Sequence, residues 1–297
     1  MGTQFSISQP QILPLLSFSL LLCLSSASTD YTNLIYRGCA NQNFPDPSDS
    51  YTQTLKTLFN SLISQSSKTN FSKETAGEGS QAGIFGLYQC RGDLNSVDCN
   101  NCVSQFPKIA SKYCGSSSIA VRIQLSGCYM RYEIVGFKQI SSTELLYKNC
   151  KKGEVKDGSF EVKRENAFQQ VESGVTSEGG FYAASYDSVY VLGQCEGDLV
   201  GSECGECVKT GLERVKAECG DAVSGQVYLN QCYISYTYYP NGVDEEKASS
   251  PGTKQGTAKT VAIVLGATAA AGFVVAILLC TKSVFKKKPS KHHYGGG

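Results

Sequence analysis

The 297-residue chain has no tryptophan, only two histidines and little charge. Both histidines, His292 and His293, lie within the last six residues, so the rest of the chain must act without an imidazole. This excludes Ser-His-Asp and Cys-His nucleophiles and most histidine-containing metal sites from the bulk of the protein. The 27 basic and 26 acidic side chains nearly balance, which argues against a nucleic-acid-binding protein.

Two uncharged segments near the ends predict export and a membrane anchor. An apolar run followed by small residues is typical of a signal peptide, here residues 1–28. A second apolar segment, residues 260–280, is long enough as a helix to cross a hydrocarbon core of about 30 Å. Five lysines and no acidic residue follow it, so the positive-inside rule places a short basic tail, residues 281–297, in the cytosol.

The chain has 14 cysteines, and their spacing indicates an internal duplication. Apart from Cys23 and Cys280, they form two sets of six. The first set is Cys39, Cys90, Cys99, Cys102, Cys114 and Cys128, and the second is Cys150, Cys195, Cys204, Cys207, Cys219 and Cys232. Four successive members are offset by 105 residues between the sets. Such regularity predicts two copies of one domain, residues 29–138 and 142–240, joined to the membrane segment by a flexible stalk at 241–259.

Six cysteines in an exported domain favour three disulfides, each contributing about 2–4 kcal/mol to stability. The spacing leaves the pairing within each set open. Cys204-Gly-Glu-Cys207 also has the spacing of a thioredoxin-type redox pair, and four thiolates with such spacings can bind zinc. An oxidising compartment and an even number of cysteines favour disulfides over both alternatives. We therefore expect neither a metal nor a cofactor.

Hydrophobic periodicity predicts an amphipathic helix in the first copy, capped by Ser48 or Asp49. The residues at helical spacing are Tyr51, Leu55, Leu58, Phe59, Leu62 and Ile63. A second helix is expected after the Cys-x-x-Cys element, with Pro107 as a local irregularity. Its expected buried face is Cys102, Val103, Phe106 and Ile109.

Segments rich in aromatic and branched residues predict strands at 83–90, 120–135 and 225–239. Together with the helices, they indicate an α+β fold. The expected architecture is two tandem disulfide-rich domains, each an antiparallel sheet packed with two helices, plus a single transmembrane helix.

The repeated Cys-x8-Cys-x2-Cys motif, at Cys90 and again at Cys195, resembles the ginkbilobin-like (stress-antifungal) domain of plants. With a signal peptide, one membrane helix and a tiny tail, the whole chain resembles the plasmodesmata-located proteins. Cysteine-rich receptor-like kinases share such ectodomains, but a tail of 17 residues is too short for a kinase. The resemblance implies the disulfides Cys39–Cys114, Cys90–Cys99, Cys102–Cys128, Cys150–Cys219, Cys195–Cys204 and Cys207–Cys232.

A secreted relative in the ginkbilobin-like family binds mannose through an Asn, an Arg and a Glu at fixed offsets from its cysteines. The first copy has Arg122 and Glu133 at two of these positions but Ala40 in place of the Asn. The second copy has Lys151, Gln226 and Thr237 there. Arg122 and Glu133 are therefore candidates for glycan binding. If Ser126-Gly127 is a tight turn, they are diagonal neighbours on one sheet face, and the alternative is a surface ion pair.

Several further sequence features are candidate interaction or modification sites. Arg91-Gly92-Asp93 resembles an adhesion motif, but Glu196-Gly197-Asp198 in the second copy favours a shared turn. Asn70-Phe71-Ser72 is an N-glycosylation sequon. Small residues line one side of the membrane segment and favour helix association, and a palmitoylated or free Cys280 lies at its cytosolic end. The stripe comprises Ala262, Gly266 and Ala270.

The family resemblance implies a non-enzymatic type I membrane protein at the plasma membrane of plasmodesmata. Such proteins modulate cell-to-cell trafficking, promote callose deposition, act in defence signalling and serve as docking receptors for viral movement proteins. The partners implied are the protein itself or related members, receptor kinases, callose synthase complexes and a cell-wall glycan. The alternatives are a lectin-like glycan-binding defence protein or co-receptor at the plasma membrane, and an oxidoreductase that uses Cys204 and Cys207.

Overall fold

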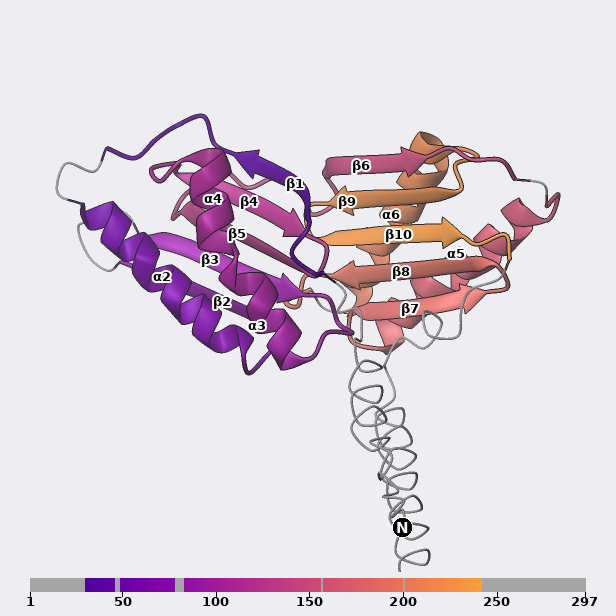
Figure 1. Ribbon diagram of the computed structural model, residues 1–297, viewed down its shortest axis with the longest axis horizontal. Helices are drawn as coiled ribbons and strands as arrows, with labels where there is room; N and C mark the ends of the chain where they lie inside the picture. Colours follow the sequence, from indigo (N-terminus) through magenta and orange to yellow (C-terminus); the bar gives the residue numbers. More distant parts are fainter. Residues whose placement is uncertain (1–29, 46–48, 78–82, 156, 200, 242–297) are drawn as a thin grey trace, which may run out of the picture. The chain divides into compact units, whose positions relative to one another are not determined.

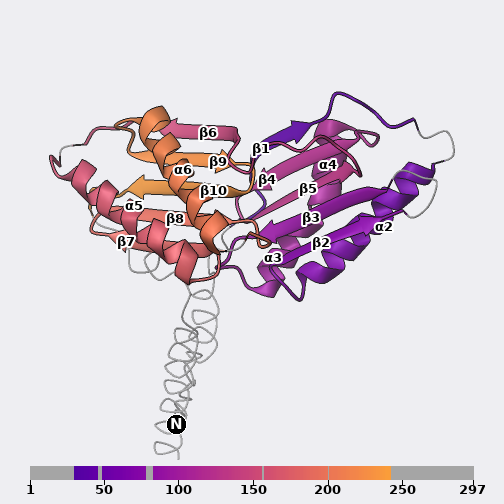
Figure 2. The ribbon, with the colours of Figure 1, turned by 180° about the vertical axis from the view of Figure 1, so that it is seen from behind.

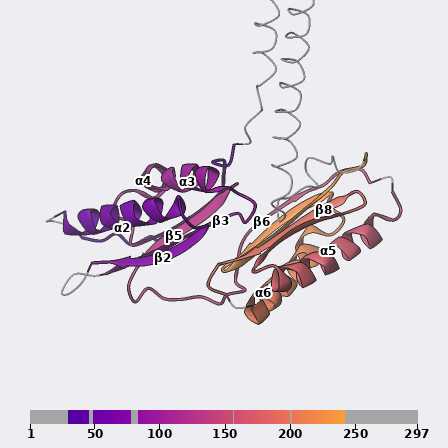
Figure 3. The same ribbon diagram turned by 90° about the horizontal axis from the view of Figure 1, so that it is seen from below.

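The protein is described by a computed structural model that covers residues 30–241, except 46–48, 78–82, 156 and 200. These residues form two compact units, each with a five-stranded antiparallel sheet and helices on one face (Figures 1 and 3). Unit 1 extends to Tyr147 and also includes Glu196–Leu199, whereas unit 2 comprises Lys148–Cys195 and residues 201–241. The expected signal peptide, stalk, membrane segment and tail lie outside the described residues. Within those residues, no helix has the length and hydrophobicity needed to cross a membrane.

The described part of unit 1 contains five strands and three helices. In chain order they are β1 (Leu34–Cys39), α2 (Ser50–Ser66), β2 (Phe71–Ala76), β3 (Ile84–Cys90), α3 (Ser96–Ser104), α4 (Phe106–Cys114), β4 (Ala120–Leu125) and β5 (Cys128–Ile134). The sheet order is β1-β4-β5-β3-β2, so the last two strands of this unit, β4 and β5, lie inside the sheet.

The described part of unit 2 repeats this topology with one helix fewer. Its elements are β6 (Leu145–Lys151), α5 (Phe160–Ser177), β7 (Phe181–Tyr186), β8 (Val189–Cys195), α6 (Gly201–Cys219), β9 (Ser224–Leu229) and β10 (Cys232–Tyr238). The sheet order, β6-β9-β10-β8-β7, corresponds strand by strand to that of unit 1. Two antiparallel sheets packed with helices confirm the expected α+β architecture.

The first expected helix is α2, and its apolar stripe forms the core of unit 1. Tyr51, Leu55, Leu58 and Leu62 are buried against the sheet, while Phe59 and Ile63 are partly buried. The cap differs from the expectation. Asp49 occupies the N-cap position with a left-handed backbone (φ 54°), but its side chain accepts no capping hydrogen bond. Ser48 lies outside the described residues.

The second expected helix begins earlier than predicted, so the Cys-x-x-Cys element lies within α3 rather than before it. The side chain of Asn95 accepts hydrogen bonds of 2.9 Å from the backbone amides of Val97 and Asp98, which starts the helix. Cys102, Val103 and Phe106 are buried as expected, and Ile109 is partly buried.

Pro107 divides this helix into α3 and α4. Because proline has no amide hydrogen, it cannot continue the helical ladder and is tolerated in the first turn of a new helix. In unit 2, Leu212 lies 105 residues after Pro107, and α6 continues through this position without a break.

The three expected strand segments are present, and two of them are hairpins. Residues 83–90 contain β3, residues 120–135 contain β4 and β5, and residues 225–239 contain β9 and β10. Strand β8 is the counterpart of β3, as the duplication predicts. The four strands that sequence reasoning missed, β1, β2, β6 and β7, lie at the sheet edges. Edge strands lack a partner on one side, and all six residues of β7 are half-buried, so no hydrophobic alternation marks them.

The two cysteines of the Cys-x-x-Cys element fasten the helix to two adjacent strands. Three residues apart on α3, Cys99 and Cys102 lie on the same side of the helix. Cys99 bonds to Cys90 at the end of β3, and Cys102 bonds to Cys128 at the start of β5. Cys90 and Cys128 lie directly opposite each other in the β3/β5 pairing, so the two disulfides also fix the strand register.

The remaining disulfide of each unit fastens the other end of the same helical region to an edge strand. Cys114 at the end of α4 bonds to Cys39 of β1. Unit 2 repeats the whole arrangement with Cys150–Cys219, Cys195–Cys204 and Cys207–Cys232, and Cys195 again lies opposite Cys232. These six pairs are the ones that the family resemblance implies.

The disulfides of unit 1 differ in exposure, which predicts an order of reduction. Cys39 is exposed, whereas Cys90, Cys99 and Cys102 are fully buried. Because a reducing thiolate must reach a sulfur atom, mild dithiothreitol at neutral pH should open Cys39–Cys114 before the other two bridges. Partial reduction, alkylation and mass spectrometry of peptides would measure this order. Simultaneous labelling of all three pairs would contradict it.

Candidate functional site

Charged and aromatic side chains gather on one face of the first sheet. The register places Arg122 of β4 opposite Arg131 of β5, and Tyr129 and Glu133 lie two residues to either side of Arg131. Since alternate residues of a strand point to the same face, these side chains share one surface. It is opposite the face that carries α2 to α4, because the intervening Met130 and Tyr132 belong to the helix-covered core.

Arg122 and Glu133 are diagonal neighbours, as the expected tight turn at 126–127 requires, but each has its own contacts. The guanidinium of Arg122 lies over the ring of Tyr129, 5.2 Å from its centroid. An oxygen of Glu133 accepts hydrogen bonds from Arg131, at 3.3 Å, and from the side chain of Gln139, at 2.7 Å. The cation that contacts Glu133 is therefore Arg131, which the sequence analysis did not single out.

The three positions of the mannose-binding pattern do come together in unit 1. The amide of Ala40 donates a hydrogen bond of 2.8 Å to the carbonyl of Ala120, and Ala120 is the register partner of Glu133. Arg122 lies two residues further along the same strand. However, Ala40 offers a methyl group where the pattern needs an amide, and the Glu133 carboxylate is engaged by Arg131 and Gln139. The chemistry of the mannose site is therefore incomplete here.

Arg131 also contacts a second carboxylate, which is almost completely buried. Its guanidinium lies 3.3 Å from Oε1 of Glu196, whose side chain is 2% exposed. Burial raises the pKa of the Glu196 carboxyl from its ordinary value of 4.5, although the positive charge of Arg131 opposes the change. Oε2 of Glu196 and the hydroxyl of Tyr129 are buried without a hydrogen-bond partner among the described residues. Burial also raises the pKa of Tyr129.

One sequence signal pointed to Glu196. The second copy carries Glu196 where the first has Arg91, so the duplicated Cys-Arg-Gly-Asp segment reverses charge. A reversal inside an otherwise repeated motif marks a position whose environment differs between the copies.

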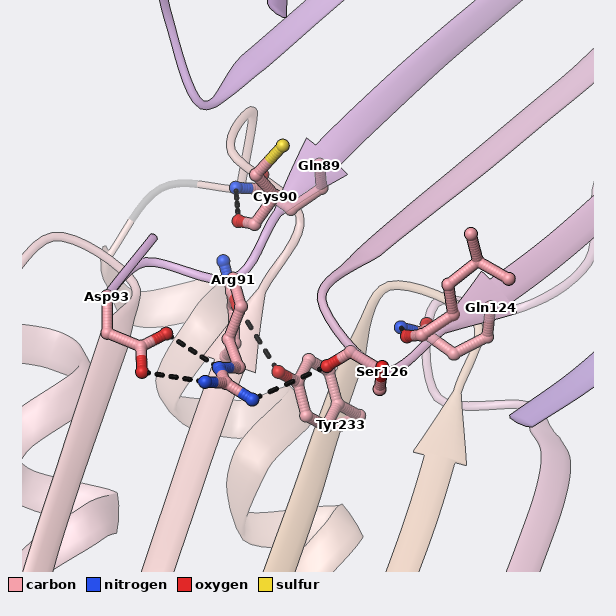
Figure 4. A network of polar contacts seen from close by, with 9 residues as sticks. Gln89, Cys90, Arg91, Asp93, Gln124, Ser126 and Tyr233 are labelled. Carbon is pink, nitrogen blue, oxygen red and sulfur yellow. Dashed lines mark hydrogen bonds and ion pairs between the residues drawn. The ribbon is translucent and has the colours of Figure 1, made fainter. Parts of the chain in front are cut away.

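The Arg91-Gly-Asp segment forms a turn in which the two charged side chains pair with each other. The guanidinium of Arg91 makes two hydrogen bonds to the Asp93 carboxylate, at 2.6 and 2.9 Å, and lies 5.2 Å from the ring centroid of Tyr31. Figure 4 shows Arg91 and Asp93 pointing toward each other, with Arg91 also reaching the Ser126 carbonyl. The amide of Leu94 closes the turn on the Arg91 carbonyl at 3.0 Å. The charges of this motif are thus paired internally, which favours the turn interpretation over adhesion.

Every described cysteine belongs to a disulfide, and Cys204 and Cys207 bond to different partners. The two motif cysteines therefore do not form the redox pair that the spacing permitted, and neither offers a thiolate to zinc. Asn70 of the expected sequon is half-buried and directly precedes the edge strand β2, with its backbone carbonyl accepting a bond from the Cys90 amide at 2.7 Å. Ala262, Gly266, Ala270 and Cys280 lie outside the described residues.

A cleft of about 350 Å³ separates α2 from α4 in unit 1. Leu55, Phe59 and Tyr132 supply apolar surface, and Lys56 and Asn60 lie at the same cleft. Phe59 and Tyr132 meet edge to face, with ring centroids 5.6 Å apart. These aromatic contacts belong to the packing of α2 on the sheet.

Comparison with known proteins identifies the family. Residues 38–134 and 148–239 match the Salt stress response/antifungal family. The chain is 48% identical to plasmodesmata-located protein 2 of Arabidopsis thaliana, over 92% of this chain and 96% of that protein. The chain belongs to the plasmodesmata-located protein family. Plasmodesmata-located protein 1 of the same plant is also 48% identical, over 90% of this chain and 93% of its own length.

A solved structure supports the fold of this plasmodesmata-located protein. The tandem DUF26 ectodomain of the cysteine-rich receptor-like protein PDLP8 from Arabidopsis thaliana matches with a TM-score of 0.64. The two sequences are 32% identical, and the match covers 70% of this chain and 99% of that one. The described residues thus have the fold of a tandem DUF26 ectodomain.

The buried ion pair predicts a large loss of stability when its cation is removed. Arg131→Ala leaves the Glu196 carboxylate without its hydrogen-bonded guanidinium, and we expect the free energy of unfolding to fall by about 3–5 kcal/mol. Urea unfolding followed by circular dichroism would measure the loss. Lys73→Ala is a matched control because it removes a more exposed pair with Asp198, whose side chains are 52% and 28% exposed, and should cost less than about 1 kcal/mol. Equal losses in the two variants would contradict the prediction.

The raised pKa of Glu196 predicts a pH dependence of stability with a defined sign. Above pH 4.5 the unfolded chain releases this proton more readily than the folded protein does. The free energy of unfolding of the unmodified protein should therefore decrease, relative to Glu196→Gln, as the pH rises above this value. Urea titrations of both proteins between about pH 4 and 7 would test this. A difference that stays constant or changes in the opposite direction would contradict the assigned shift.

Proposed function

We propose that this chain is a non-enzymatic, receptor-like membrane protein of plasmodesmata that modulates cell-to-cell traffic. The observation that carries the proposal is the 48% identity to plasmodesmata-located protein 2 over 92% of the chain. The relative's name states a location, and the identity extends over both cysteine-rich domains. A similarity of this extent supports the same location for this chain.

The proposed mechanism relies on recognition by the ectodomain and action by partners. All described cysteines are in disulfides, and Arg91, Arg131 and their acidic neighbours are paired with one another. Disulfides and internally paired charges are suited to a rigid scaffold that presents a binding surface to a partner. The tandem ectodomain would bind a wall component or a neighbouring protein, and a recruited synthase would deposit callose.

The proposed topology places the two domains outside the cell and the tail at 281–297 in the cytosol. The segment at 260–280 would anchor the protein and, through Ala262, Gly266 and Ala270, associate with another copy or a related member. Receptor kinases, callose synthase complexes and viral movement proteins are the further partners that we propose. Asn70 is the proposed glycosylation site.

Imaging tests the location directly. A fluorescent protein fused after Gly297 should appear in leaf epidermis as paired spots across the wall that coincide with callose staining. The same fusion lacking residues 260–280 serves as a control and should lose the spots. An even outline of the plasma membrane would overturn the plasmodesmal location and favour the alternative, a lectin-like co-receptor at the general cell surface.

A further inference from the structure

Unit 2 has a polar groove of about 530 Å³ between helix α5 and edge strand β7. Helix α5 lies along β7 and β8 on one face of the second sheet (Figure 2). From the helix, the amides of Asn166, Gln169 and Gln170 line the groove, and from the strand, Tyr182 and Tyr186 line it. The two tyrosines are four residues apart and therefore lie on the same face of β7, about 13 Å apart along the strand.

A glycine in α5 lets one of these tyrosines lie close to the helix. A Cβ atom at Gly174 would lie 2.1 Å from Cγ of Tyr182 and less than 2.5 Å from both Cδ atoms. The Tyr182 ring therefore lies across the helix backbone at a position where no other residue fits without a shift. Gly174 is buried, although the α5 residues beside it that line the groove are polar. This close packing fixes the Tyr182 ring at the wall of the groove.

The polar groups of the groove are available to a ligand. The side chains of Asn166, Gln169 and Gln170, and the hydroxyls of Tyr182 and Tyr186, make no hydrogen bond to any other described residue. Each carboxamide offers both donors and acceptors, which matches hydroxyl groups that also donate and accept. Tyrosine rings add flat apolar surface with a polar edge. Amides beside two aromatic rings are suited to a saccharide.

The charge of the groove further limits the class of sugar that it can bind. Its lining contains no lysine or arginine among the described residues, and Glu178 is its single acidic side chain. An anionic sugar would be repelled by this carboxylate and would find no cation to pair with. A neutral sugar needs only hydrogen bonds and ring contacts, so neutral saccharides fit best.

Unit 1 lacks the two tyrosines at the equivalent positions of its edge strand β2. Tyr182 pairs with Gly193, and Ser72 pairs with Tyr88. Because Gly193 and Tyr88 are separated by the repeat offset of 105 residues, Ser72 occupies the position in unit 1 that Tyr182 occupies in unit 2. By the same alignment, Tyr186 corresponds to Ala76. Tyrosine at these two positions is therefore not required by the scaffold that the two copies share.

We propose that the α5/β7 groove binds a neutral oligosaccharide chain. The separation of the two tyrosines requires a ligand longer than a single sugar, with one ring near each tyrosine. This inference rests on the proposed function in one respect, since the groove must face an extracellular space in which such glycans occur. The site differs from the Arg122 and Glu133 positions, which lie in unit 1.

Binding by the purified full-length chain in detergent tests the proposal. Biolayer interferometry would use biotinylated hexasaccharides as probes, namely β-1,4-glucan, β-1,3-glucan and β-1,4-mannan as neutral chains and hexagalacturonate as the acidic chain. At least one neutral chain should bind, and hexagalacturonate should not. Tyr182→Ala and Tyr186→Ala should each weaken binding about tenfold. The Tyr182→Phe variant should keep binding within about threefold, because it retains the ring.

Two further variants separate recognition from folding. Asn166→Ala with Gln170→Ala removes two amides from α5 but introduces strong helix formers, so the fold should persist while binding weakens about tenfold. Tyr113→Ala removes a partly exposed tyrosine from unit 1 and should leave binding unchanged. Absence of binding to every neutral chain at millimolar concentration, preference for hexagalacturonate, or equal binding by the α5 variant would overturn the proposal. None of these outcomes alters the imaging result, so failure here is distinguishable from failure of the proposed location.

Discussion

The fold of each unit depends on one covalent constraint, in which two cysteines on one side of a helix bond to two directly paired residues of adjacent strands. In unit 1, Cys99 and Cys102 reach Cys90 and Cys128, which lie opposite each other. A slip of one residue between β3 and β5 would move every side chain of one strand to the other face and separate these sulfurs. The same two bonds therefore hold the helix in place and set which residues enter the core.

The sequence predicted the parts of the fold that depend on local patterns. The helical spacing from Tyr51 to Ile63 and the cysteine repeat each leave a direct signal, and both features are present in the structure. The sheet order could not be predicted in this way, because it depends on contacts between distant residues. Strands β1 and β6 pair with β4 and β9 in their respective sheets, and their half-buried and exposed residues show no clear alternation.

In the candidate site, too, the contacts between side chains that are distant in the sequence could not be predicted. A tight turn was sufficient to place Arg122 and Glu133 on one face, and the register agrees. The partner of Glu133 was not predicted: it is Arg131, two residues earlier on the same strand, which also contacts Glu196 far along the chain. The α5/β7 groove was not predicted at all. It depends on the approach of Tyr182 to Gly174, which no periodicity in either segment reveals.

Each disulfide among the described residues joins two cysteines of the same set of six, which has a consequence for how the chain is made. Synthesis proceeds from the N-terminus, so Cys128 leaves the ribosome before Cys150. The first domain can then complete all its bridges while the second set of thiols is still being translated. This order of synthesis reduces competition between equivalent cysteines of the two copies for the same partner. Duplication in tandem thus doubles the number of thiols without a matching increase in the risk of mispairing.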